Sequence, residues 1–235
     1  MLLCLLPYYA LGIGDGFFLP VLVRYPAQFW LYDAAKFVFI PAACLLLFHR
    51  YFHIHPTAYF FTGRAVDYRG WEWLGVTFLS ALMLAVVYFV AYPVLAILLL
   101  APLALVRWML SLWLDLPAIS LHYEAVFGYG VALPDDRILR AIVAVFFSIT
   151  AGVVEEIFFR GLLRQAVAAL LGQRAVKTYI VFSALIFGLA HWEQGSAGLV
   201  AATSFGLCAA WLYLKLGDLR PLIVAHTIID LYIFW

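Results

Sequence analysis

Ionisable side chains inside three otherwise apolar segments are the residues of this 235-residue chain whose types and spacing could do chemistry. The first segment carries Glu155-Glu156-Ile-Phe-Phe-Arg160 and follows residues 141–154, which hold no charged side chain. Glu156 and Arg160 are four residues apart, so they stack on one helical face and can form an ion pair. Glu155 has Phe159 in the corresponding position. A carboxylate without such a partner, in a poorly solvated place, suits a general base.

Histidines mark the other two segments. His191 ends the uncharged run Phe187-Gly-Leu-Ala-His191, and His226 precedes Asp230 by one helical turn on the same face. Either histidine alone could be a packing residue, and the His226–Asp230 pair could simply lock two helices together. Helices that bury such groups turn them toward each other, because ionisable side chains are costly in a bilayer. A carboxylate and imidazole groups around one cavity can activate a water and stabilise an oxyanion.

The composition requires that membrane helices carry these groups. Hydrophobic residues make up 67% of the chain and charged residues 11%, with a mean hydropathy of +1.04. A soluble domain has about 45–50% apolar and about 25% charged residues. The net charge of +1 gives no reason to expect a nucleic-acid partner. The cysteines, Cys4, Cys44 and Cys208, lie far apart in apolar runs and are interpreted as packing residues.

Hydropathy predicts an all-α, polytopic transmembrane helical bundle with seven or eight membrane helices, since one crossing needs about 20 mostly apolar residues. The predicted segments are residues 1–22, 29–48, 73–106, 138–171, 178–192, 196–214 and 221–235. Residues 103–114 are expected to form a separate half-helix at the interface, because Pro93 and Pro102 would kink or end the helix before it. Asp33 and Lys36 are three residues apart and are expected to pair on one helical face.

The polar loops predict an orientation. Loop 49–72 is basic, loop 115–136 is acidic, and residues 160–177 are basic again. The positive-inside rule then favours seven crossings with the amino terminus in the cytoplasm, although eight stay open. Pro134-Asp135-Asp136 predicts the start of the helix that carries the glutamates. Short loops and the lack of a targeting signal favour the inner membrane of a prokaryote.

The three motifs, in this order and each in a predicted membrane helix, resemble those of the CPBP family. These proteins are the CAAX proteases and bacteriocin-processing enzymes, also called ABI proteins, and their eukaryotic relatives are the type II CAAX-prenyl endopeptidases. The family patterns EExxxR, FxxxH and HxxxN/D are met at positions 155–160, 187–191 and 226–230. The resemblance covers residues 138–235 as a catalytic helical core, whereas residues 1–137 match only as membrane helices and polar loops.

This resemblance implies an intramembrane endopeptidase that performs CAAX-type or leader-peptide processing. Glu155 would be the base that activates the hydrolytic water, with the help of His191. Glu156 and Arg160 would form a structural or substrate-carboxylate pair. The expected partners are the lipid bilayer and a peptide or protein substrate, which is prenylated or embedded in the membrane.

The third motif sits where the family places its oxyanion-stabilising pair, here His226 and Asp230. An ionised aspartate only accepts hydrogen bonds, so Asp230 could instead orient His226, as the carboxylate does in a Ser-His-Asp triad. The favoured mechanism needs no cofactor. Zinc held by Glu155, His191, His226 and Asp230 stays open as an alternative, although the chain has no HExxH motif.

Other interpretations use the same residues. A non-catalytic membrane scaffold or bacteriocin-immunity-type protein would use the polar network for helix packing. A transporter would be expected to show an inverted repeat, and none is visible. Gly12-Ile-Gly-Asp15 matches the GxGD motif of presenilin-like aspartyl proteases, but the YD half, Tyr32-Asp33, follows it instead of preceding it.

Overall fold

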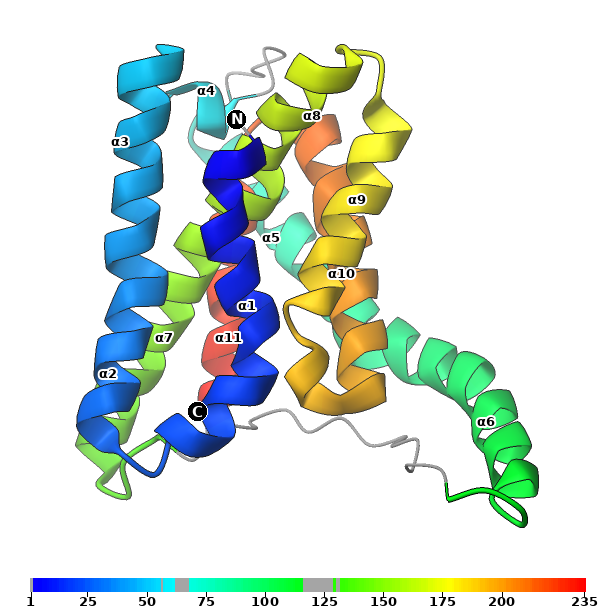
Figure 1. Cartoon of the computed structure of the whole chain (residues 1–235). Coiled ribbons are helices and arrows are strands. Elements are labelled where there is room, and N and C mark those ends of the chain that lie inside the picture. The colour runs from blue at the N-terminus through cyan, green and yellow to red at the C-terminus, as the bar shows by residue number, and fades with distance from the viewer. Residues whose placement is uncertain (1, 56, 62–67, 116–128, 130–131) are drawn as a thin grey trace.

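A computed structural model describes residues 2–55, 57–61, 68–115, 129 and 132–235, and it confirms the all-α prediction. Outside its helices, the described chain has one isolated bridge, between Phe61 and Asp218. In chain order the elements are α1 (Leu2–Leu22), α2 (Pro26–Ala34), η1 (Ala35–Phe39), α3 (Ile40–Phe52), α4 (Thr57–Phe60), α5 (Trp71–Val86), η2 (Val87–Ala91), α6 (Tyr92–Leu110), α7 (Arg137–Glu155), η3 (Glu156–Leu162), α8 (Leu163–Leu171), α9 (Val176–Leu189), η4 (Trp192–Gln194), α10 (Gly195–Leu216) and α11 (Arg220–Phe234) (Figure 1).

Multiple long apolar helices mark the chain as an integral membrane protein. In the described part of the chain, five helices are long and apolar enough to cross a membrane: Leu3–Leu22, Pro26–Phe52, Trp71–Leu110, Arg137–Leu171 and Trp192–Leu216. The 14-residue α9 and the 15-residue α11 are shorter. The predicted count of seven or eight crossings is therefore not confirmed. Most of the predicted loop 115–136, including Glu124, lies outside the described residues.

The helix Trp71–Leu110 differs from its prediction. It is continuous over 40 residues, or about 60 Å, which is twice the hydrocarbon thickness of a bilayer. The separate half-helix expected at 103–114 is wrong, since α6 continues through Pro102 to Leu110. A proline removes one backbone hydrogen bond, and membrane helices tolerate that loss. Figure 1 shows α6 running away from the rest of the bundle.

The helix that carries the two glutamates begins as the sequence predicts. Asp136 is its N-cap, because the carboxylate accepts hydrogen bonds from the backbone N–H groups of Ile138 at 3.0 Å and Leu139 at 2.9 Å. The helix then passes from α7 into η3, a π-helical segment whose residues are all buried. Such wide turns are frequent at functional sites, because they change the directions of the side chains that follow.

Small residues let the helices around η3 approach closely. A Cβ atom on Gly188 of α9 would lie 2.0 Å from the Thr203 hydroxyl of α10. A Cβ atom on Gly152 of α7 would lie 2.4 Å from the Thr227 hydroxyl of α11. Close backbone contact of this kind is how membrane helices pack without a hydrophobic driving force between them.

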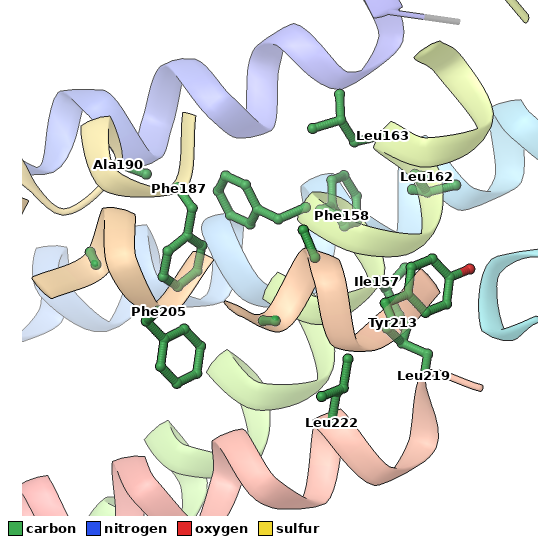
Figure 2. Close-up of a cluster of buried hydrophobic side chains, with 14 of the residues drawn as sticks. Ile157, Phe158, Leu162, Leu163, Phe187, Ala190, Phe205, Tyr213, Leu219 and Leu222 are labelled. Carbon is green, nitrogen blue, oxygen red and sulfur yellow. The ribbon is translucent and has the colours of Figure 1, made fainter. Parts of the chain in front are cut away.

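Aromatic side chains fill the space that the close helix contacts enclose. Phe158 of η3, Phe187 of α9 and Phe205 of α10 belong to one buried cluster (Figure 2). The rings of Phe187 and Phe205 stack with centroids 5.7 Å apart. This apolar cluster joins the three elements that lie around the motif residues, so it fixes the frame of the site.

Candidate active site

The structure brings the three motif segments together around Glu155. Its Oε2 atom lies 3.8 Å from Nε2 of His191 and 3.9 Å from Nε2 of His226. Glu155 ends α7, His191 follows α9, and His226 lies within α11. Glu155 is buried, whereas the His191 side chain keeps 20% of its surface exposed. The predicted convergence of the three segments is therefore present.

Glu156, the next residue, is in direct contact with His226 and Arg160. Its Oε1 atom is 2.9 Å from Nδ1 of His226 and 3.0 Å from a guanidinium nitrogen of Arg160. The predicted pairing of Glu156 with Arg160 is thus present, and both side chains are fully buried. The Arg160 guanidinium also lies 4.3 Å from the ring centroid of Phe187, where the ring face attracts a cation. These contacts hold the His226 ring in one orientation.

Asp230 lies beside His226, as its spacing predicts. Its Oδ2 atom is 3.6 Å from Nε2 of His226, which is an ion-pair distance and too long for a hydrogen bond. Because Nδ1 of His226 donates to Glu156, Nε2 can donate only when the ring is an imidazolium. An ionised Asp230 could accept from that imidazolium, so its place suits an orienting role.

The ring of His191 is fixed from the other side. Its Nδ1 atom lies 2.8 Å from the carbonyl oxygen of Phe187, one helical turn earlier. A carbonyl only accepts, so the neutral ring carries its proton on Nδ1 and presents a lone pair on Nε2. Nε2 of His191 and Oε2 of Glu155 are then two acceptors that face each other at 3.8 Å. A water between them can donate one hydrogen bond to each.

Helix α1, from the part of the chain outside the motifs, supports the turn that carries His191. The indole N–H of Trp192 donates to the carbonyl oxygen of Ile13 at 2.6 Å. A Cβ atom on Gly16 would lie 2.4 Å from the Trp192 ring, and one on Gly12 would lie 3.1 Å from Cβ of Ala190. The prediction of residues 1–22 as a membrane segment gave these glycines no role in packing. Their GxxxG spacing, which is typical of close helix contacts, is the signal that could have revealed the role.

A second buried ion pair lies across the cavity. Nζ of Lys36 in η1 is 2.5 Å from Oδ2 of Asp15 in α1, and the hydroxyl of Tyr32 donates to the same carboxylate. The pairing expected between Asp33 and Lys36 is therefore wrong. The local spacing rule considers one helix only, whereas burial pairs Lys36 with a carboxylate of the neighbouring helix. Sequence reasoning did not place Asp15 or Lys36 in the site.

The Asp15–Lys36 pair and the residues around Glu155 line one cavity of about 90 Å³, which has room for water molecules. Its ionisable lining residues are Asp15, Lys36, Glu155, His191, Glu193, His226 and Asp230. Aromatic side chains such as Phe147, Phe187 and Phe205 form much of the remaining wall. The arrangement is a largely apolar pocket with convergent polar groups, which is the usual form of a small-molecule or active site.

The four candidate zinc ligands do not fit a zinc ion as they lie. Two donors on a tetrahedral zinc at 2.0–2.1 Å should be about 3.3 Å apart. The measured separations are 3.6 Å for Asp230 with His226 and 3.8 to 3.9 Å for Glu155 with the two histidines. Within the described ranges, no group of three His, Cys, Asp or Glu side chains could hold a metal.

The fold and the site define a class of protein: a polytopic helical membrane protein with a glutamate and two histidines around one cavity. Residues 137–232 match the family model described as Type II CAAX prenyl endopeptidase Rce1-like. This segment therefore belongs to the Rce1-like CAAX protease family, and the resemblance drawn from the three motifs is confirmed over it. Comparison with curated proteins and with solved structures finds no match.

Proposed function

We propose that this protein is an intramembrane endopeptidase of the CAAX-protease type, in which Glu155 and His191 activate the water that cleaves a peptide bond. One observation carries the proposal: Oε2 of Glu155 faces the ring nitrogens of two histidines from two other segments in one cavity. The family match over residues 137–232 supports the same reaction class.

The proposed reaction begins with a water between Glu155 and His191. Glu155 takes one proton while the water oxygen bonds to the peptide carbonyl carbon, and the carbonyl electron pair moves onto its oxygen. His226, held by Glu156 through Nδ1 and charged as an imidazolium beside Asp230, donates its Nε2–H to that oxyanion. When the carbonyl re-forms, the C–N bond breaks and Glu155 returns its proton to the leaving nitrogen. No metal takes part in this sequence of steps.

The proposed substrate is a peptide in or at the membrane, such as a prenylated CAAX protein or a leader peptide. The shorter helices α9 and α11 would complete seven crossings, and we assign the protein to a prokaryotic inner membrane. The division into residues 1–137 and a catalytic core at 138–235 stays a prediction.

The experiment that tests the function needs no prior choice of substrate. Wild type and Glu155→Gln are expressed at equal abundance in cells that lack the native copy, and all protein termini are compared by mass spectrometry. We expect termini that appear with wild type and disappear with Glu155→Gln, because an amide cannot take the water's proton. Glu72→Gln, at an exposed glutamate of α5, is the matched control and should give the wild-type pattern.

Identical termini in all three strains, together with a phenotype that Glu155→Gln rescues, would reject the peptidase. The polar network would then serve helix packing, as in the scaffold or immunity-type alternative. Equal protein levels and equal melting temperatures in detergent are required for either conclusion, because a misfolded variant also loses its products.

A further inference from the structure

Lys36 is a buried cation that the reaction described above does not use. It lies in η1, outside the segment that matches the family, and it is 6% exposed. A charged side chain within a membrane segment is costly and marks a functional site by default. Lys36 lines the same cavity as Glu155 and His191.

The position of the Lys36 ammonium is fixed. Asp15 accepts one of its three N–H bonds, and Tyr32 holds the same carboxylate through its hydroxyl. The ammonium also lies 4.8 Å from the ring centroid of Phe37 and 5.5 Å from that of Tyr129. Within the described residues, Asp15 is the hydrogen-bond acceptor recorded for this ammonium. The other two N–H donors of the ammonium have no acceptor among the described residues.

The catalytic cavity has few positively charged groups that could stabilise a developing negative charge. Asp230, at the position where the family has an asparagine or an aspartate, only accepts when ionised. Arg160 is fully buried against Glu156 and does not line the cavity. Among the described lining residues, Lys36 is the one permanent cation.

We infer that Lys36, held in place by Asp15, binds the anionic oxygen that forms on the scissile carbonyl. The inference rests on the proposed peptidase function and adds to it a catalytic residue from the amino-terminal helices. The ammonium donates a hydrogen bond to the oxyanion opposite His226, without proton transfer, while the water's proton goes to Glu155 as before. The interaction is stronger in the transition state than with the neutral carbonyl, so it acts on kcat.

The test uses the purified full chain and a farnesylated, internally quenched CAAX peptide, made with a free and with an amidated carboxyl end. If wild type does not cleave that peptide, a peptide spanning the site found by the comparison of termini replaces it. We expect Lys36→Gln to lower kcat by about 10²–10³-fold on both forms, with KM little changed. Lys36→Arg should retain part of the rate. Lys177→Gln, at an exposed lysine of α9, is the matched control.

Lys36→Gln leaves the Asp15 carboxylate buried without its cation, so a folding defect must be separated from a catalytic one. The Asp15→Asn/Lys36→Gln double variant removes both charges together. At a wild-type melting temperature, the double variant should show the same loss in kcat as Lys36→Gln. A wild-type kcat in the double variant would overturn the inference.

Two further outcomes are decisive. A loss confined to KM for the free-carboxyl peptide would overturn the oxyanion role, because Lys36 would then bind the terminal carboxylate of the substrate. Glu155→Gln is assayed in parallel. If Glu155→Gln is inactive and the Lys36 variants are fully active, the inference alone is wrong. If Glu155→Gln is active, the proposed function is wrong as well.

Discussion

Two neighbouring glutamates of one helix have opposite surroundings. Glu156 is fully buried, and both of its recorded partner atoms, on His226 and Arg160, lie within 3.0 Å. Glu155 has its charged neighbours, His191 and His226, at 3.8 to 3.9 Å, and it faces the cavity. Neighbouring side chains on a helix point about 100° apart, so one points into the packed core and the other to an open space.

The difference distinguishes a group that holds structure from one that can do chemistry. Direct contacts at 2.9 to 3.0 Å leave no room for a water between Glu156 and its partners. The wider separations around Glu155 leave room for a water or a substrate atom. The direct contact of Glu156 with His226 keeps that ring of the open site in place.

The largest expected effect concerns Glu155, which faces the cavity. Glu155→Gln should lower kcat/KM by about 10²–10⁴-fold, the usual range for a general base. Its melting temperature in detergent should stay close to that of wild type, because Glu155 makes no contact shorter than 3.8 Å with a charged group among the described residues. A large loss of stability instead would mean that both glutamates are structural.

Replacement of Glu156, by contrast, should lower stability. Glu156→Gln leaves the Arg160 guanidinium in a fully buried place without its counter-charge. Breaking a buried ion pair from one side costs about 3–5 kcal/mol. Thermal unfolding in detergent measures this cost, with Glu72→Gln as the exposed control. A variant that keeps its stability but loses activity would remove the distinction between the two glutamates.

The distance between helices α7 and α11 can be changed without touching either glutamate. Gly152→Ala places a Cβ atom 2.4 Å from the Thr227 hydroxyl and 3.0 Å from the Thr227 backbone nitrogen. Such overpacking costs about 1–3 kcal/mol and should move Glu155 and Glu156 away from His226 together. Gly75→Ala in α5 meets no atom within 4 Å and is the control. Equal melting temperatures and activities of the two variants would contradict the close contact.

Asp230 should tolerate the family's other choice at its position. Asp230→Asn keeps the side-chain shape and keeps an oxygen near the His226 ring, which is 3.6 Å away at present. We expect kcat/KM to change by less than about tenfold, or about 1.4 kcal/mol. Steady-state kinetics on the peptide used for Lys36 measures the change. A loss as large as that of Glu155→Gln would show that the aspartate carboxylate itself takes part in catalysis.

The smallest expected effect concerns metal. Since the donor separations are too wide for zinc, chelation with EDTA or 1,10-phenanthroline should leave the rate unchanged, and added Zn²⁺ should not raise it. Activity that is lost on chelation and restored by zinc would mean that the side chains around Glu155 move together and bind a metal.

The motifs were predictable from the sequence because each is a short pattern on one helix. Glu156 with Arg160 and His226 with Asp230 follow the four-residue spacing, and both pairs are present. The helix start at Asp136 was equally local. The same local rules failed for the half-helix at 103–114, where a continuous membrane helix tolerates its proline.

By itself, the sequence determined that the chain forms apolar membrane helices and which of them carry ionisable groups, because hydropathy and helical spacing act within one segment. Only the tertiary structure decided the partners between segments: Asp15 for Lys36, and Ile13 with Gly16 for Trp192. Those contacts depend on how far neighbouring helices are rotated and how closely they approach. Small residues and buried charges set the rotation of the helices and the distance between them. A residue pattern within one helix does not predict either quantity.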